Sequence, residues 1–333
     1  MKEKLKNILL YIKNNIAFFI FLILLILAFE MDTPYSVYSP GGLINVDERL
    51  KGGTYKSEGN INLTYVTFSN GKIPNLILAL VLPKWDIVKN SDVTYDNETL
   101  EELNLKDRIH LYESVSNATY VAYTNANKNL EIVSEANYIV TIADYAETNL
   151  KIGDKIISIE NTRVNNYNDL LNIIKTCDFN DKLHIKIKRK NKEVESYAII
   201  KNDNGEKRIG IGLSKINEYK KDPDITYNYR DNESGASGGL MLSLALYNAL
   251  TENDITNGKT ISGTGTINQN GEVGEISGIK YKLSGAVKKK SDIFIAPSAN
   301  YDEAIKEKEK NNYKIQIIKA ENFKQVLEDL KKV

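Results

Sequence analysis

The chain has 333 residues and carries 44 basic and 44 acidic side chains, so its net charge is zero. This balance excludes a general electrostatic attraction to nucleic acid, and the length is typical of about two domains. The single cysteine, Cys177, excludes an intrachain disulfide, and two histidines far apart in the sequence give no cluster for zinc. We therefore expect neither a metal nor a cofactor.

The first predicted element is an apolar helix over Ile8–Phe29, whose second part, IAFFIFLILLILAF, has no charged or polar side chain. A spanning helix needs roughly 20 apolar residues, a length that this segment reaches if Lys13 lies at the interface. Lysines precede the run and Glu30 and Asp32 follow it, so the positive-inside bias places the N-terminus in the cytoplasm and the remaining chain outside. We expect residues 1–30 to be a tail and a retained single-pass transmembrane anchor. The alternative, a cleaved signal peptide, lacks an A-x-A-like site.

The second region, residues 31–127, is expected to form an extracytoplasmic N-terminal region. It begins with an extended arm, YSVYSPGG, that ends in a Pro-Gly turn. The segment NINLTYVTFS alternates well enough for a strand. Further on, apolar residues recur near a spacing of 3.6, including Leu103, Ile109 and Val115, and predict a long helix. His110 lies in that helix, where we expect it to be structural.

The third region, residues 128–204, has short alternating strands and one predicted helix from Tyr167, a pattern typical of a small, partly open β-barrel. Its segment LKIGDKIISI, Leu150–Ile159, is similar to a strand of the PDZ domains of bacterial membrane-associated proteases. The resemblance implies a PDZ fold and a groove that takes a peptide by strand addition. The expected carboxylate-binding loop is IADYAETN, Ile142–Asn149, which lacks a clear Gly-Leu-Gly-Phe-like element.

The last region, residues 205–333, mixes helices and strands, so the chain as a whole is expected to be an α+β multidomain protein. A helix is predicted to follow the glycine-rich stretch SGASGG, and another is predicted over Lys280–Lys289. The remaining predicted elements are strands over Ile209–Leu213, Ile225–Tyr229, Asp292–Ala296 and Tyr313–Ile318, a hairpin over Lys259–Ile276 and two further helices.

Ser237 lies at the start of the first of these helices and has two interpretations. It can be a plain helix N-cap, a position that serine favours. It can also be a nucleophile, because free backbone N–H groups at a helix start can bind a developing oxyanion. The glycines around it, Gly235, Gly238 and Gly239, let a substrate backbone approach closely.

A nucleophilic serine needs a base, and both histidines lie in other regions. A lysine held neutral is the alternative. Helical spacing places Lys280 in line with Leu283 and Val287, on the apolar face, and turns Lys282 to the opposite side. Burial and the positive helix start both disfavour an ammonium group. We therefore predict Lys280 as the base.

The two stretches around these residues resemble the Lon-type peptidase domain. SGASGGLMLSLAL is similar to its serine motif, and TGTINQNGEVGEISGIKYKL is similar to its lysine motif, TGxxxxxGxVxxIGGxKxK. The resemblance implies a catalytic dyad of Ser237 and Lys280, with Thr264 as a supporting hydroxyl and Gly235 and Gly238 beside the serine. The positions that fit without a gap are Thr264, Gly265, Gly271, Val273, Ile276, Gly278 and Lys280.

The order of anchor, PDZ domain and Lon-type domain resembles the YlbL-like Lon-like PDZ proteases. The resemblance implies an ATP-independent, membrane-anchored serine endopeptidase that cleaves extracytoplasmic peptides or proteins, and a homo-oligomer by analogy with Lon-type rings. NGKT at Asn257–Thr260 is no P-loop, because Asn253 stands where glycine is required. The alternatives are a non-catalytic PDZ receptor for peptides and a purely structural envelope protein. The substrate, and whether the PDZ domain recruits it or blocks the site, stay open.

Overall fold

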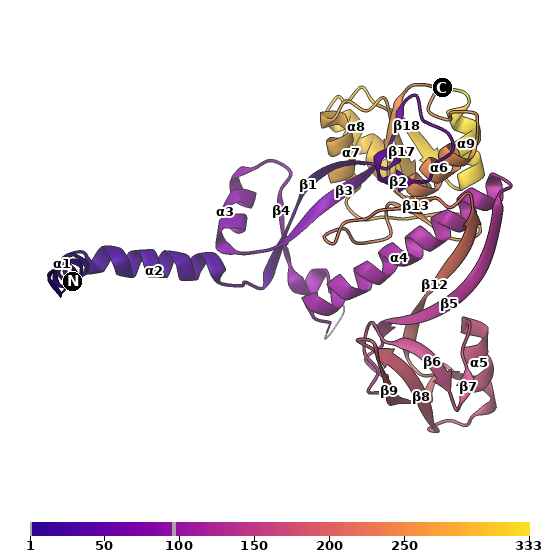
Figure 1. The fold of residues 1–333 in the computed structure, drawn as a ribbon, viewed down its shortest axis with the longest axis horizontal. Helices are drawn as coiled ribbons and strands as arrows, with labels where there is room; N and C mark the ends of the chain where they lie inside the picture. The colour runs from indigo at the N-terminus through magenta and orange to yellow at the C-terminus, as the bar shows by residue number, and fades with distance from the viewer. Residues whose placement is uncertain (1, 95–97) are drawn as a thin grey trace. The chain divides into compact units, whose positions relative to one another are not determined.

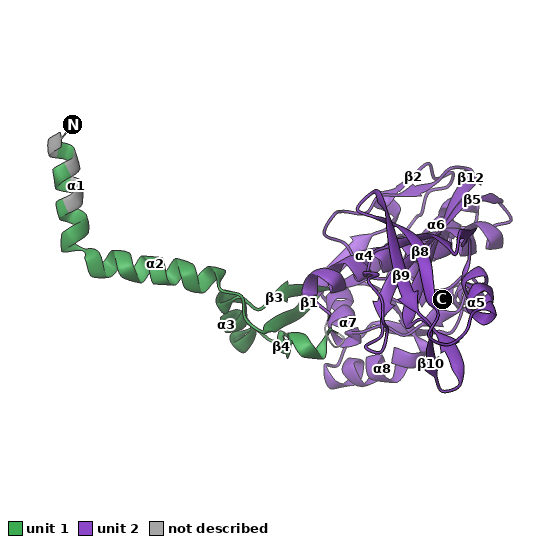
Figure 2. Cartoon of the chain, turned by 90° about the horizontal axis from the view of Figure 1, so that it is seen from below, with its two compact units in different colours: residues 1–40, 66–95 green, residues 41–65, 96–333 purple. Residues whose placement is uncertain are grey.

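The computed structural model describes residues 2–94 and 98–333. They form two compact units (Figure 2): one combines residues 1–40 and 66–95, and the other combines residues 41–65 and 96–333. The chain therefore leaves the first unit, returns to it and leaves it again. The two long strands that make these passages are β1 (Tyr35–Asn45) and β3 (Asn60–Asn70).

The N-terminal apolar segment forms two helices in place of the single predicted one. They are α1 (Lys2–Asn14) and α2 (Ile16–Glu30), separated at Asn15. Asn15 has φ −116° and ψ 26°, outside the helical range, which ends the first helix there. Among the described residues, no helix is both long and apolar enough to cross a membrane. The prediction of one continuous spanning helix over Ile8–Phe29 is not supported.

The rest of the first unit is a short helix and an edge strand. Helix α3 (Ile73–Val81) has Pro74 in its first turn, where the missing N–H of proline costs no helical hydrogen bond. Strand β4 (Asp86–Lys89) then pairs antiparallel with the beginning of β1, with Tyr35 opposite Lys89.

A parallel sheet forms the base of the second unit. Strand β14 (Thr260–Gly263) lies between β3 and β17 (Ile293–Pro297) and runs parallel to both, and β17 is parallel to β18 (Gln316–Ala320). The register places Thr260 opposite Asn60. Residues 31–127 therefore do not form a region apart from the C-terminal one, because β3 and β1 belong to the sheet that carries the C-terminal motifs. The predicted hairpin over Lys259–Ile276 is also wrong in its first part, since β14 pairs only in parallel.

Helix α4 (Leu100–Asn125) crosses this unit and packs against helix α6 (Gly239–Leu250) (Figure 1). A capping box starts it: the Thr99 side chain accepts from the N–H of Glu102, and the Glu102 side chain accepts from the N–H of Thr99. Its buried residues Ala118, Val121, Ala122 and Tyr123 share one core cluster with α6. The predicted long helix is thus part of the core on which α6 packs.

The remaining elements of this sheet layer are short helices and ribbons. Helices α7 (Ile279–Lys288) and α8 (Tyr301–Lys310) share a second core cluster with β17. Helix α9 (Phe323–Leu330) packs against α6 and β18. The two-stranded ribbons are β2 (Leu50–Lys51) with β13 (Thr226–Tyr227), and β15 (Thr266–Ile267) with β16 (Val273–Gly274).

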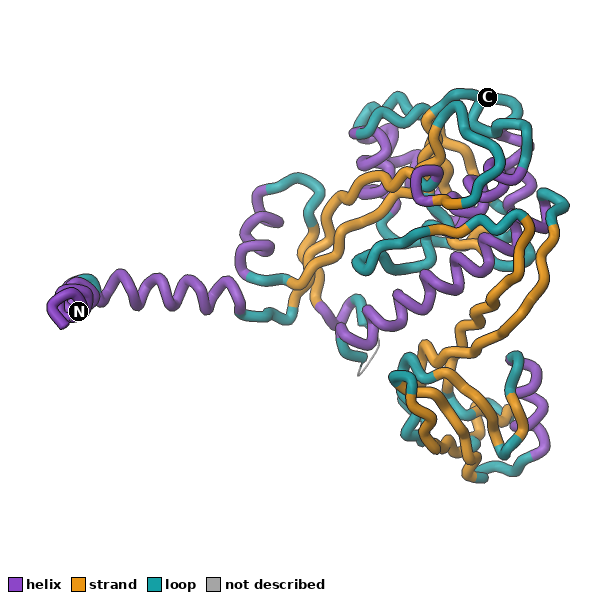
Figure 3. Tube along the Cα trace, viewed as in Figure 1, coloured by secondary structure: helices purple, strands orange, loops and turns teal. Residues whose placement is uncertain are grey.

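A second six-stranded sheet with its own core is inserted between α4 and α6. Its strand order is β12-β5-β6-β8-β9, all antiparallel, and one helix, α5 (Tyr167–Thr176), packs on it. Strands β5 (Asn129–Ile142) and β12 (Ile211–Asp222) run side by side from α4 to this sheet (Figure 3). The sequence boundary at residue 204 is therefore too early, because β12 completes this sheet. The other elements are β6 (Lys155–Ile159), β7 (Thr162–Arg163), β8 (Lys182–Arg189), β9 (Lys192–Ile199), β10 (Lys201–Asp203) and β11 (Glu206–Arg208).

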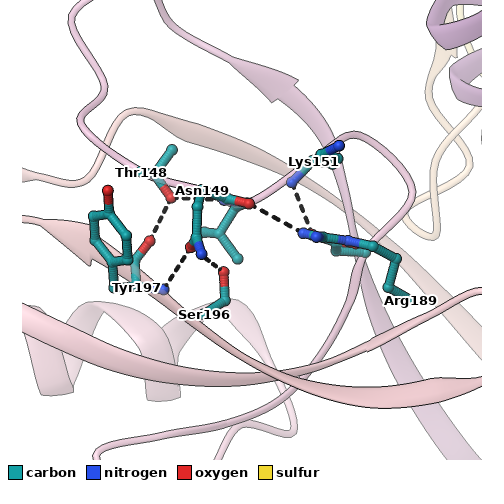
Figure 4. A network of polar contacts seen from close by, with 8 residues as sticks. Thr148, Asn149, Lys151, Arg189, Ser196 and Tyr197 are labelled. Carbon is teal, nitrogen blue, oxygen red and sulfur yellow. Dashed lines mark hydrogen bonds and ion pairs between the residues drawn. The ribbon is translucent and has the colours of Figure 1, made fainter.

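The end of the loop predicted to bind a peptide carboxylate is tied to strand β9. The Thr148 hydroxyl donates to the Tyr197 carbonyl oxygen at 2.5 Å, and the Asn149 side-chain oxygen accepts from Ser196 Oγ at 2.5 Å (Figure 4). Arg189 Nη2 donates to the Asn149 carbonyl oxygen at 3.1 Å. These bonds indicate a structural role for the end of the Ile142–Asn149 loop.

Candidate active site

Ser237 lies in the turn just before α6 and does not cap the helix. The N-cap residue is Gly238, and no side-chain capping bond is present at this described end. The N-cap interpretation of Ser237 is therefore wrong. Within the described residues, the N–H groups of Ser237 and Gly238 donate to no protein acceptor, so both can serve a ligand.

Helix α4 holds the turn from the side. The N–H of Gly235, whose φ is +85°, donates to the Asp107 carbonyl oxygen at 2.8 Å. Ser114 Oγ donates to the Ala236 carbonyl oxygen at 3.0 Å. A Cβ on Gly239 would approach Ser114 Oγ to 2.6 Å, so glycine is required there for this close contact. Burial raises the pKa of the Asp107 carboxyl above its usual range.

The segment after β14 fixes the backbone of Ser237. Its carbonyl oxygen accepts from Thr264 Oγ1 at 2.9 Å and from the Gly265 N–H at 2.8 Å. The Gly265 carbonyl oxygen in turn accepts from the Leu240 N–H at 3.0 Å. Bonds on both sides of the turn leave Ser237 little freedom, a condition for a precisely placed hydroxyl.

The buried lysine of helix α7 is Lys282. Only 4% of it is exposed, and its Nζ donates to Thr264 Oγ1 at 3.1 Å. Burial lowers its pKa to about 8. Lys280 is only half-buried, and its Nζ lies 4.8 Å from the ring centroid of Tyr281. The prediction that Lys280 is on the apolar face and Lys282 on the opposite one is wrong.

The error lies in the choice of helix face. The core side of α7 contains Ile279, Lys282, Leu283 and Ala286, which recur at the i, i+3, i+4 and i+7 spacing of one face. The prediction placed Lys280 and Leu283 on one apolar face, but Lys280 lies at the edge of the buried face. The lysine motif itself contains two lysines, and the packing of α7 decides which one is buried.

Thr264 connects the two parts of the site. It is fully buried, and its hydroxyl accepts from Lys282 and donates to the backbone of Ser237. The structure thus brings Ser237, Thr264 and Lys282 together, with Gly235 and Gly238 in the same turn, and leaves Lys280 outside this chain of bonds. A hydroxyl, an amine of lowered pKa and two unengaged N–H groups are the components that acyl transfer requires.

A groove beside the sheet that contains β5 and β12 is a second candidate site. It measures about 420 Å³, with one wall formed by Leu170, Leu171 and Ile174 of α5 and the other by the segment Arg208–Gly212 and the end of β5. Strand β12 is at the end of the sheet order, so its edge faces no further strand of that sheet in the described chain. The glycines that border the groove are in Ile209–Gly212, not in the loop expected from the sequence.

The comparisons with known proteins agree with this division. Residues 231–332 match the family model of the Lon protease (S16) C-terminal proteolytic domain, and residues 124–198 match that of the PDZ domain. The first match indicates that the chain is a serine peptidase. The second match suggests that its PDZ domain binds a peptide or protein. No curated protein matches the chain.

Several solved structures match part of the chain. The PDZ domain of the SdrC-like protein from Listeria monocytogenes is 20% identical over 25% of this chain and 92% of its own, with a TM-score of 0.23. A protein from Geobacillus thermodenitrificans is 17% identical over 20% of this chain and 79% of its own, with a TM-score of 0.19. The second domain of a listeria protein is 21% identical over 26% of this chain and 88% of its own, with a TM-score of 0.22.

Proposed function

We propose that the chain is an ATP-independent endopeptidase in which Ser237 is the nucleophile and Lys282 is the general base. The observation that carries this assignment is the burial of Lys282, whose pKa of about 8 leaves a usable fraction of neutral amine near pH 7. Its bond to Thr264, whose hydroxyl also donates to the Ser237 carbonyl oxygen, supports a site that combines the two residues.

In the first step, neutral Lys282 Nζ takes the proton from the Ser237 hydroxyl as Oγ bonds to the scissile carbonyl carbon. The carbonyl electron pair moves to oxygen, and the N–H groups of Ser237 and Gly238 are the proposed donors to that oxyanion. When the tetrahedral intermediate collapses, the C–N bond breaks and the proton on Lys282 goes to the leaving amine. Water then attacks the acyl-serine ester and gives a proton to Lys282. Collapse of this second intermediate breaks the bond between the carbonyl carbon and Oγ, and Lys282 returns the proton to Ser237 Oγ as the acid product leaves.

A pair of single-atom deletions tests the nucleophile. Ser237→Ala removes Oγ from the proposed nucleophile, and Ser234→Ala removes the same atom from an exposed serine of the same loop. We expect Ser237→Ala to abolish hydrolysis of unfolded casein and Ser234→Ala to keep wild-type activity. Neither should change the free energy of unfolding by more than a few tenths of a kcal/mol, because neither serine caps α6. An active Ser237→Ala enzyme contradicts the assignment, and a wild-type chain without activity on any protein substrate favours the alternative of a PDZ receptor.

The proposal includes attachment to a membrane through the N-terminal helices. All fifteen described residues of α2 are at least partly exposed, although its sequence is apolar up to Phe29. Such a surface is unfavourable in water and favourable in lipid. The lysines before the apolar run orient the chain with its N-terminus in the cytoplasm and the peptidase on the extracytoplasmic side. This arrangement would group the chain with the YlbL-like Lon-like PDZ proteases.

The groove between α5 and β12 supports a second function, the binding of an extended peptide. The apolar wall from α5 suits its side chains, and the edge of β12 suits its backbone, as in strand addition. Arg208 lines the groove, but its guanidinium group is already paired with Glu206 at 2.5 Å and with Asp203 at 3.4 Å. In this proposal, the PDZ domain recruits protein substrates to the peptidase.

A further inference from the structure

We propose that helix α3 is a second membrane contact, which lies on the lipid surface beside the N-terminal helices. This inference rests on the proposed membrane attachment. Its starting observation is an exposed apolar face of α3: Ile77, Leu80 and Val81 are 58%, 77% and 72% exposed. Monomeric soluble proteins seldom expose contiguous side chains of this kind, and such patches mark contacts with proteins or membranes.

The exposed side chains share one helix face. Ile77, Leu80 and Val81 have the i, i+3, i+4 spacing of a single stripe, and Leu78 and Leu82 extend it at its borders with 43% and 38% exposure. Ala79, the one buried residue of this fully described helix, is directed the other way. Ile73 and Leu76 of α3 are half-buried and Ala79 is buried, whereas Ile77, Leu80 and Val81 are the most exposed apolar groups of the helix.

The position of α3 indicates lipid as the occupant. Lys72, the N-cap residue of α3, forms an ion pair of 2.6 Å with Glu30, the last residue of α2, and the two helices are in contact. An exposed ion pair of this kind contributes little stability, but it places the start of α3 at the end of the apolar α2. In Figure 1, α3 runs across the direction of α2. If α2 enters lipid, α3 lies along the lipid surface, the orientation of an interfacial helix.

The segment after α3 has residues typical of the headgroup region. Lys84 and Trp85, the chain's single tryptophan, follow the helix. Tryptophan is enriched at membrane–water interfaces, and lysine can extend its ammonium group from there into water. The exposed apolar helices α2 and α3 thus contact each other within one unit, and interfacial residues follow α3, which favours a bilayer over a second copy of the chain as the occupant.

A relocated tryptophan tests this contact in the full chain. One variant carries Trp85→Phe with Leu80→Trp, and its matched control carries Trp85→Phe with Val133→Trp, at a site of β5 that is 57% exposed. Both are reconstituted in vesicles of phosphatidylcholine and phosphatidylglycerol, with or without acyl chains brominated near the headgroup. We expect bromination to reduce the fluorescence of the tryptophan at position 80 at least twofold and that at position 133 by less than a fifth. Hydrolysis of a short peptide should be unchanged in both.

The outcomes separate the two proposals. Chains that do not float with vesicles refute membrane attachment, and the α3 contact with it. Chains that float, with equal quenching or none at both positions, refute the α3 contact alone. If Leu80→Glu converts a larger species of the detergent-solubilised chain to a monomer and position 80 is not quenched, the occupant is a second copy, and the lipid contact is wrong.

Discussion

Replacing Lys282 by methionine tests the proposed base most directly, because the structure sets the expected size of the effect. With the ordinary lysine pKa of 10.5, only about 0.03% of the amine is neutral at pH 7, whereas a pKa of about 8 leaves about 9% neutral. Burial thus raises the neutral fraction about 300-fold. The rate of peptide hydrolysis by the wild type should rise about tenfold between pH 7 and pH 9, with an apparent pKa near 8.

The lowered pKa of Lys282 also sets the expected difference in stability between Lys282→Met and the wild type. A folded pKa of about 8 in place of 10.5 lowers the free energy of unfolding by about 3 kcal/mol when Lys282 is in its ammonium form, at 1.36 kcal/mol per pKa unit. The penalty is absent above pH 10.5, grows as the pH falls from 10.5 to about 8, and is complete below about 8, because the folded pKa is the lower one. Lys282→Met should therefore be inactive and about 1–3 kcal/mol more stable than the wild type at pH 7, with the difference declining towards pH 10.5 in denaturant titrations.

The matched control is Lys280→Met, two residues earlier on the same helix. It should keep the wild-type rate within about twofold, with the same pH profile, because its side chain is outside the hydrogen-bonded site. Lys282→Arg should be inactive, since arginine stays protonated. An inactive Lys280→Met enzyme beside an active, folded Lys282→Met enzyme would refute the argument from burial.

Two further variants test the surroundings of the dyad and the groove. Thr264→Val removes the hydroxyl that accepts from the Lys282 ammonium group, so we expect the rate to fall about tenfold or more and the apparent pKa of the pH–rate profile to decrease. The control Thr264→Ser keeps the hydroxyl and should keep the wild-type rate and pKa. An unchanged profile of Thr264→Val would contradict the role of this hydroxyl. Leu171→Glu places a charge in the groove wall, so it should slow the cleavage of unfolded casein several-fold and leave the cleavage of a short peptide unchanged. The control Asn172→Glu changes an exposed residue of the same helix that is outside the wall, and it should change neither rate. Equal losses on both substrates would argue against recruitment by the groove.

Local patterns were sufficient for the features that depend on neighbours in the sequence. The segment Leu150–Ile159 predicted a strand and the 3.6 spacing after residue 97 predicted a long helix, and the structure has β6 over Lys155–Ile159 and α4 over Leu100–Asn125, because strand and helix periodicities are local properties. The PDZ assignment came from the resemblance of the same segment, and the family match supports it. The motifs around Ser237 and Thr264 indicated the peptidase class, which the family match confirms. The nucleophile itself stays a prediction.

Only the tertiary structure decided which lysine is buried and which segments share a sheet. Lys280 and Lys282 are two positions apart on one helix, and the choice between them depends on the surface against which α7 packs. Likewise, Thr260 pairs with Asn60 across 199 intervening residues, and no local pattern specifies a partner at that distance. The amino-acid sequence by itself determined the types of elements and the chemical groups present. Long-range packing determined which of these groups meet. Burial depends on the two surfaces that pack together, whereas the periodicity of a segment describes only the surface of that segment.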